Sequence, residues 1–225
     1  MMSVSVLIPA FNESNRIVDT IRGMENIKEI DEIIVVNDGS TDDTADKAKK
    51  AGAKIVNIKN NSGKGKALKE GLKYVKNDVV AFIDADVGLT SREVIKLIEP
   101  VINGEADVTV ARFPKVNVKS GFGFVKKLAK YGVKLLTGYD FDSTLSGQRV
   151  FKKEVLDKIK KFYSGYGIEV GMTIDILNMG YKIKEIDVDM THSVTLRDLK
   201  GFIHRGRQFI DILKVLFIKA FFKDR

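Results

Sequence analysis

The residues best suited to chemistry are two aspartates separated by one small residue, Asp84-Ala85-Asp86. They follow the apolar run at residues 79–83 and lead toward Gly88. Taken alone, such a pair is most often a solvated turn. At the end of a buried strand, however, two carboxylates can share a hard cation with diphosphate oxygens. We therefore predict a Mg²⁺ or Mn²⁺ site at Asp84 and Asp86, with Ala85 between them against a bound diphosphate.

Polar residues also gather after three other apolar runs, at residues 9–13, 37–40 and 60–65. Glu13 could accept hydrogen bonds from ribose hydroxyls, and Asp38 from the amino or imino group of a base. Gly63 and Lys64 suit a phosphate, because glycine permits close backbone approach and lysine adds positive charge. Any one group could be an ordinary turn or helix cap. Four such groups predict one ligand site.

Alternating strands and helices must position these residues. The strand candidates are Val4–Ile8, Glu32–Val36, Lys54–Ile58 and Asp78–Asp84, and the helix candidates are Glu13–Met24, Asp42–Ala51 and Gly63–Lys76. Two of the strand runs are apolar without alternation, which is typical of strands covered on both faces. The pattern predicts a parallel α/β sheet whose ligand crevice lies at the carboxyl ends of the strands.

The second half continues with less regular spacing. We expect helices at residues 91–103, 124–136 and 168–179, strands at 107–111 and 182–188, a strand and turn at 144–151, and a loop at 113–123. A long helix should begin near Leu196. The expected organisation is one domain at residues 1–195, divided into a nucleotide-binding half (1–112) and an acceptor half (113–195), followed by a basic amphipathic helix at 196–225.

Composition narrows the class of protein. The chain has 225 residues, a net charge of +8 and no cysteine, which excludes disulfides and thiolate sites. Residues 197–225 hold eight Lys/Arg and three Asp/Glu, so this segment supplies +5 of the +8. No signal peptide, membrane span or nucleic-acid motif is recognisable. We expect a cytoplasmic protein without a nucleic-acid partner.

The motifs together resemble glycosyltransferase family 2, whose members have the GT-A fold, a Rossmann-like, mostly parallel sheet flanked by helices. The matching segments are residues 6–13, 33–44, 61–68 and 83–86, in the family's order. The resemblance implies that Pro9, Ala10, Phe11, Asn12, Glu13 and Asp38 hold a nucleoside, usually uridine or guanosine. It places Lys64 near the base or diphosphate and the metal on Asp84 and Asp86.

The second half of the chain resembles two subgroups of this family. Residues 142–151 are similar to polyprenyl-phosphate sugar transferases, which often have Phe at the position of Gln148. Residues 165–171 and His192 are similar to the glucosyl-3-phosphoglycerate synthase group, which implies His192 as a third metal ligand. That group's phosphoglycerate-binding Gly-Arg segment is not found at residues 113–123. The acceptor therefore stays open.

Further candidates each have a structural alternative. Glu169 is either a helix-start acid stabilised by the helix dipole or a catalytic carboxylate beside the sugar or acceptor, and Asp86 is the other catalytic candidate. Asp142, Gly147, Arg149 and Arg205 are candidates for acceptor or diphosphate contacts. Asp142 and Arg149 could equally serve only to order the Ser-Gly turn.

The segment from Leu199 carries an apolar stripe and becomes apolar nearly all round beyond Ile212, with lysines interspersed. It could pack on the core, form a homodimer, or lie on an anionic membrane with its lysines snorkelling. If it lies on a membrane, we expect the protein to attach peripherally to the inner face of that membrane.

The function expected is transfer of a sugar from a UDP- or GDP-linked donor to an acceptor such as a polyprenyl phosphate. The alternatives are transfer to a soluble phosphorylated acid and sugar nucleotidyl transfer. The latter needs a Gly-rich, Arg-containing loop after the first strand, which residues 9–13 do not provide. An oxidoreductase is disfavoured because Gly-x-Gly-x-x-Gly is missing there. A non-catalytic binding protein is disfavoured by the retained Lys64, Asp84 and Asp86.

Overall fold

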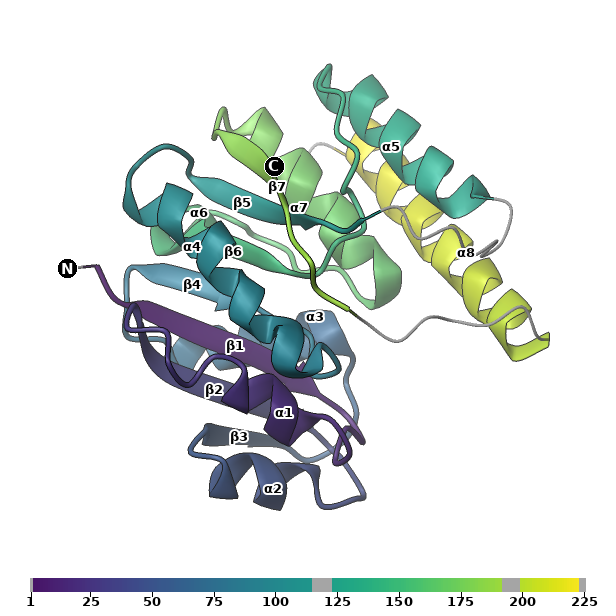
Figure 1. Cartoon of the computed structure of the whole chain (residues 1–225). Helices are drawn as coiled ribbons and strands as arrows, with labels where there is room; N and C mark the ends of the chain where they lie inside the picture. The colour runs from purple at the N-terminus through teal and green to yellow at the C-terminus, as the bar shows by residue number, and fades with distance from the viewer. Residues whose placement is uncertain (1, 115–122, 192–198, 223–225) are drawn as a thin grey trace.

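A single seven-stranded sheet forms the centre of the molecule (Figure 1). The computed structural model describes residues 2–114, 123–191 and 199–222, with side chains from residue 206 onward in the last range. The strands are β1 Val4–Ala10, β2 Ile30–Asp38, β3 Lys54–Ile58, β4 Val79–Phe82, β5 Val108–Arg112, β6 Arg149–Lys152 and β7 Ile183–Asp187. Their order is β3-β2-β1-β4-β6-β5-β7. Only β6 runs antiparallel to its neighbours, which confirms a mostly parallel sheet.

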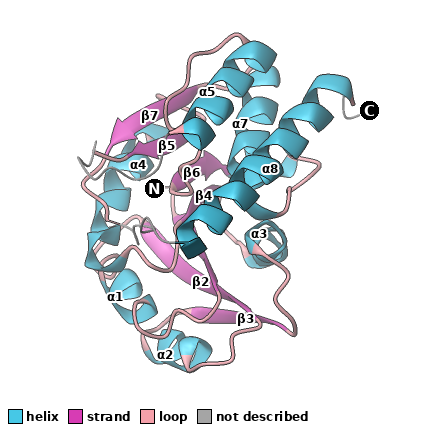
Figure 2. Ribbon diagram, turned by 90° about the vertical axis from the view of Figure 1, so that its right-hand side faces the viewer, coloured by secondary structure: helices cyan, strands magenta, loops and turns pink. Residues whose placement is uncertain are grey.

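Helices cover both faces of the sheet and make three layers (Figure 2). The helices are α1 Ile17–Arg22, α2 Thr44–Lys50, α3 Lys64–Gly71, α4 Val94–Ile102, α5 Phe124–Thr137, α6 Lys153–Asp157, α7 Ile168–Asn178 and α8 Leu199–Phe221, with 3-10 turns η1 Leu72–Tyr74, η2 Gly88–Glu93 and η3 Gly165–Gly167. One core lies under α1, α2 and α4, and the other under α3 and α5–α8. Alternation along the strands feeds both cores, since Val6 and Ile8 enter one and Leu7 the other.

Most element boundaries differ by a few residues from the sequence prediction, and two of these differences affect the site. Strand β4 ends at Phe82, so Asp84 and Asp86 lie in the loop that follows it. The first helix begins at Ile17 rather than Glu13, because Arg16, with φ −126°, departs from helical geometry. The amides of Asn12 and Glu13 donate to Ser40 Oγ and Thr44 Oγ1.

In the segment predicted as strand and turn, residues 144–151, the strand begins at Arg149. Residues 144–146 turn back, so that the carbonyls of Thr144 and Ser146 accept hydrogen bonds from the Arg149 guanidinium. The structure therefore has both the turn and the strand that the sequence predicts at residues 144–151, with the turn first. Among the described residues, no helix has the length and apolarity needed to cross a membrane.

Candidate active site

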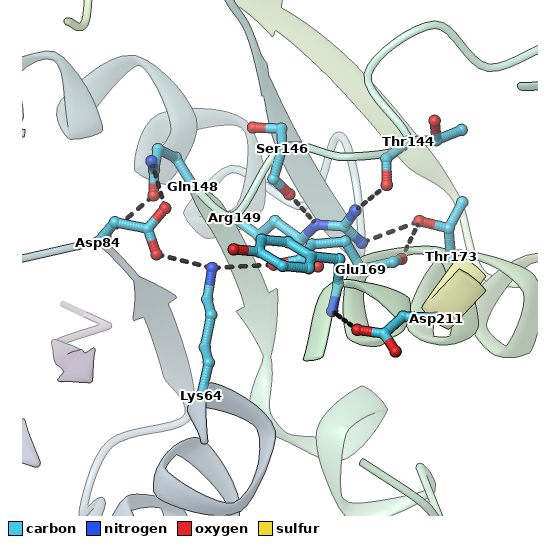
Figure 3. Close-up of polar contacts among 10 residues, drawn as sticks. Lys64, Asp84, Thr144, Ser146, Gln148, Arg149, Glu169, Thr173 and Asp211 are labelled. Atoms are coloured by element: carbon cyan, nitrogen blue, oxygen red, sulfur yellow. Dashed lines mark hydrogen bonds and ion pairs between the residues drawn. The ribbon is translucent and has the colours of Figure 1, made fainter. Parts of the chain in front are cut away.

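Asp84 is held by a glutamine on the antiparallel strand beside it. The Asp84 amide donates to Gln148 Oε1 at 3.0 Å, and Gln148 Nε2 donates to Asp84 Oδ2 at 2.9 Å (Figure 3). Pairing of Phe82 with Arg149 in the ladder between β4 and β6 brings the two residues together. Gln148 is buried. The pair of bonds fixes both the backbone and the carboxylate plane of Asp84.

Lys64 links this aspartate to Glu169. Lys64 is the first residue of α3, after the N-cap Gly63 with φ +85°. Its Nζ lies 2.7 Å from Asp84 Oδ1 and 2.9 Å from Glu169 Oε1 (Figure 3). Burial alone would lower the pKa of the Lys64 ammonium, but the two carboxylates more than offset this and raise it. Lys64 is therefore a fixed positive charge at the centre of the site.

Gly147 has no side chain, and the Lys64–Asp84 ion pair occupies the space where one would lie. A Cβ atom at residue 147 would lie 2.4 Å from Lys64 Nζ and 2.7 Å from Asp84 Oδ2. Any larger side chain would therefore displace the lysine or the carboxylate. Gly147 was predicted to contact acceptor or diphosphate, and its position directly against Lys64 and Asp84 favours a place at the site.

Arg149 lies buried beneath the site. Its Nε donates to Ser146 O at 2.8 Å and its Nη1 to Thr173 Oγ1 at 2.9 Å. Thr173 Oγ1 in turn donates to the carbonyl of Glu169 at 2.8 Å. Burial lowers the pKa of Arg149 to about 10. These contacts favour the alternative that Arg149 orders the turn before β6 and supports the start of α7.

Asp86 lies on the other side of Asp84, with Arg16 Nη1 at 3.8 Å from its Oδ2. Burial raises the pKa of Glu13, and the charges of Asp86, Asp42 and Asp84 add to the increase while Arg16 opposes it. Negative charge therefore accumulates between the loops after β1 and β4.

A divalent cation fits this concentration of carboxylates. The described part of the chain contains no group of three or more His, Asp or Glu residues with metal-binding geometry. Two aspartates together with ligand oxygens can complete the coordination that Mg²⁺ requires, since Mg²⁺ commonly uses one or two carboxylates plus phosphates. Asp84 and Asp86 are the residues of this chain that would hold the ion.

The nucleoside side of the site is built from loops that bind one another. Asp38 is buried, and its oxygens accept from Ser62 N and Ser62 Oγ at 2.9 and 2.7 Å and from Gly63 N at 2.7 Å. Asn12, with φ +57°, accepts from Thr41 N at 2.8 Å. The predicted base contact of Asp38 stays a prediction. In this structure its carboxylate holds the loop that precedes Lys64.

The remaining donor candidates lie along the same edge. Pro9 and Ala10 end β1 beside Val36 and Asn37, and Phe11 is exposed. Ala85 is buried, with its carbonyl accepting from Thr20 Oγ1 at 2.8 Å. The structure thus brings the predicted donor residues of β1, β2, α3 and the β4 loop to the carboxyl ends of the parallel strands.

One predicted residue, Asp142, is not part of this cluster, and two others cannot be placed relative to it. Asp142 is exposed and forms an ion pair with Lys130 of α5. His192 lies outside the described residues, as does the side chain of Arg205. The residue before His192 donates from its amide to Thr90 Oγ1 at 3.0 Å, and Thr90 lies in η2, shortly after Asp86. The metal role of His192 stays a prediction.

Sequence reasoning missed Gln148 and Thr173 as parts of the site. Gln148 precedes the strand that pairs with β4, so knowledge of that pairing would have indicated it. Thr173 lies one helical turn after Glu169 on α7, at the i+4 spacing that places two residues on one face.

The sheet topology, the acidic loop after β4 and the half-buried lysine at the start of α3 define a GT-A-like fold. The family model "Glycosyl transferase family 2" matches residues 5–160. The chain belongs to glycosyltransferase family 2.

The chain is similar in sequence to several glycosyltransferases. Glycosyltransferase AglJ of Haloferax volcanii is 28% identical over 188 residues, which cover 80% of this chain and 60% of AglJ. Dolichol-phosphate mannosyltransferase of Pyrococcus furiosus is 28% identical over 216 residues, covering 89% and 60%. The chain thus spans about three fifths of the length of these two relatives.

A solved structure is also closely similar. Glucosyl-3-phosphoglycerate synthase of Mycobacterium tuberculosis, in complex with Mn²⁺, UDP and glucosyl-3-phosphoglycerate, superposes with a TM-score of 0.83 at 27% identity. The superposition covers 99% of this chain and 81% of that one. The same enzyme has also been crystallised with Mg²⁺ and UDP, and with Mn²⁺, UDP-glucose and phosphoglyceric acid.

Proposed function

We propose that this protein transfers a hexosyl group from a UDP- or GDP-linked sugar to a phosphate-bearing acceptor, with Mg²⁺ or Mn²⁺ at Asp84 and Asp86. The observation that carries the proposal is the cluster of Asp84, Lys64 and Glu169 at the carboxyl ends of the strands. The metal and UDP in the M. tuberculosis relative support the donor side.

In the proposed reaction, an acceptor oxygen attacks the anomeric carbon as the bond from that carbon to the diphosphate breaks, and the nucleoside diphosphate leaves. The bound metal would neutralise charge on the departing diphosphate. Lys64, held by two carboxylates, adds a positive charge that needs no reorientation during the reaction. Gln148 keeps the Asp84 carboxylate in place.

The ion pair of Glu169 with Lys64 favours a polyprenyl phosphate as the acceptor. Its Oε1 binds Lys64, so it would have to leave that ion pair before taking a proton from an acceptor hydroxyl. An acceptor phosphate carries an ionised oxygen near neutral pH and needs no such base. In this proposal Glu169 orients Lys64 rather than deprotonating the acceptor. The dolichol-phosphate mannosyltransferase relative is consistent with a lipid phosphate.

A soluble phosphorylated acid is the second candidate, favoured by the similarity to the phosphoglycerate enzyme over 99% of this chain. The deciding experiment incubates the protein with Mn²⁺, UDP-glucose or GDP-mannose, and either a short-chain polyprenyl phosphate or 3-phosphoglycerate. We expect a glycosylated polyprenyl phosphate. If glycosyl-phosphoglycerate is the only product, the acceptor is the soluble phosphorylated acid and not the polyprenyl phosphate. If no combination yields a glycosylated product, the proposed function is contradicted.

A further inference from the structure

An exposed apolar surface lies away from the site, on the two helices α5 and α8. The helices lie side by side and run in the same direction, with Leu216 of α8 packed against Gly132 of α5 (Figure 1). We define the α5–α8 face as the large exposed apolar residues next to this contact, namely Phe124, Tyr131, Leu135, Leu213, Phe217 and Phe221.

The face is exposed although α8 is firmly attached. Ile212, Val215 and Leu216 bury the opposite side of α8, and Lys219 forms an ion pair with Asp175 of α7 at 2.6 Å. By contrast, Leu135 is 84% exposed and Phe221 is 71% exposed. At about 3.6 residues per turn, the exposed residues of each helix fall on the same side of the pair. A contiguous apolar area of this kind marks an interaction surface.

Cations border this face along both outer edges. On α5, Lys127 comes three residues after Phe124 and four before Tyr131, and it is exposed. On α8, exposed Lys214 comes three residues before Phe217. Neither lysine has an ion-pair partner among residues that the structure describes. An apolar stripe between rows of cations is the pattern of helices that lie in an anionic lipid interface.

The acids of these elements do not reach the face. Asp211 of α8 turns toward η3, where it accepts from the Tyr166 amide at 3.3 Å. Asp140, just after α5, forms ion pairs with Lys130 and Lys134. A second copy docked by two-fold symmetry would bring the same cations together, which disfavours self-association. Anionic lipid supplies the complementary charge.

We propose that the α5–α8 face docks on the surface of a bilayer that contains anionic lipids. Helix α8 runs alongside α7, with Asp211 near the start of α7 and Lys219 near Asp175. Because Glu169 lies in the first turn of α7, the part of the α5–α8 face near Asp211 is the part nearest the active site. The inference is independent of the proposed transfer reaction and rests on exposure and charge alone.

Flotation with vesicles of phosphatidylglycerol and phosphatidylcholine in equal parts tests this, with pure phosphatidylcholine vesicles in parallel. The native protein should float with the anionic vesicles, less with neutral ones, and less in high salt. Phe217→Glu and Leu135→Glu should each lower the partition coefficient roughly tenfold or more. Leu89→Glu alters an equally exposed leucine on η2 and should leave it unchanged.

Binding by Phe217→Glu equal to that of the native protein would overturn the proposal, as would failure of the native protein to float. A native dimer that this variant dissociates, without vesicle binding, would assign the face to a second copy instead. Circular-dichroism melting checks that each variant folds. Should Phe217→Glu unfold, the exposed pair Lys127→Glu and Lys214→Glu gives the same test through charge. Nucleotide binding should be unaffected throughout, so failure of docking is distinguishable from failure of the proposed reaction.

Discussion

The two sides of the active site are held together in different ways. In residues 2–114, loop side chains bind the backbone of neighbouring loops, as Asp38 does with Gly63 and Asn12 with Thr41. In residues 123–191, side chains reach across to the first region, as Gln148 does to Asp84 and Glu169 to Lys64. The loops of the first region are therefore held by hydrogen bonds within that region. The second region supplies side chains that hold Asp84 and Lys64 of the first.

This difference gives the regions different sensitivities. Breaking a contact within the first region should change stability and loop position. Breaking a contact between the regions should change metal and diphosphate chemistry with less effect on stability, because those side chains meet at a partly open site. Four substitutions test the distinction.

Lys64→Met should have the largest effect, because it removes the cation that joins both regions and leaves Asp84 and Glu169 without it. We expect turnover of nucleotide sugar to fall by about 10²- to 10³-fold, the range for losing one preorganised charge-stabilising group. Lys66→Met is the matched control, since Lys66 lies two residues later and is exposed. Equal activity of the two variants would remove Lys64 from the site.

Gln148→Leu should weaken Mn²⁺ binding by about 10- to 100-fold, because groups that orient metal ligands typically contribute this much. The substitution removes both hydrogen bonds to Asp84. Manganese affinity measured by electron paramagnetic resonance provides the readout, with Gln208→Leu on α8 as the control. Unchanged affinity in Gln148→Leu would mean that Asp84 needs no such support.

Asp38→Ala should lower the free energy of unfolding by about 1–3 kcal/mol, because the amides of Ser62 and Gly63 lose their buried acceptor. Urea denaturation measures the change. Asp157→Ala, which removes only an exposed ion pair with Lys153, should cost less. If the two variants lose the same free energy of unfolding, the hydrogen bonds of Asp38 contribute no more to stability than an exposed ion pair.

The smallest effect concerns pH. Burial would raise the pKa of Asp42, but hydrogen bonds from Thr44 and Ser14 more than offset this and lower it from 3.8 to about 2. A lowered folded-state pKa stabilises the fold above pH 3.8, and this contribution is lost as the pH falls toward 2. Thermal melting across this range should show a shallower pH dependence for Asp42→Asn than for Asp43→Asn. Identical slopes would contradict the role of Asp42.

The sequence predicts the first region well for a physical reason. Its site residues follow directly after apolar strands, and parallel strands bring their carboxyl ends together without further information. The local pattern therefore places Asp84 and Lys64 near each other, as the structure does, while their roles toward metal and donor stay predictions. The boundaries were less accurate: α1 begins only after Arg16, whose φ of −126° is not helical, and residue type does not indicate this.

The second region could not be predicted in the same way. The contacts between Gln148 and Asp84 and between Glu169 and Lys64 span 64 and 105 residues of sequence. They depend on the insertion of antiparallel β6 between β4 and β5, which apolar patterning does not specify. For Arg149 the sequence left two roles open, a ligand contact and ordering of the Ser-Gly turn, and its hydrogen bonds to the carbonyls of Thr144 and Ser146 favour the second.

The central claim is that Asp84, Asp86 and Lys64 form a metal-dependent diphosphate site. Isothermal titration of the native protein with UDP and with GDP, each with and without Mn²⁺, tests it most directly. We predict that at least one nucleotide binds in the presence of Mn²⁺, that its affinity falls sharply without the metal, and that Asp86→Ala abolishes the difference. No binding of either nucleotide with Mn²⁺, or affinity for both that the metal does not change, would contradict the claim.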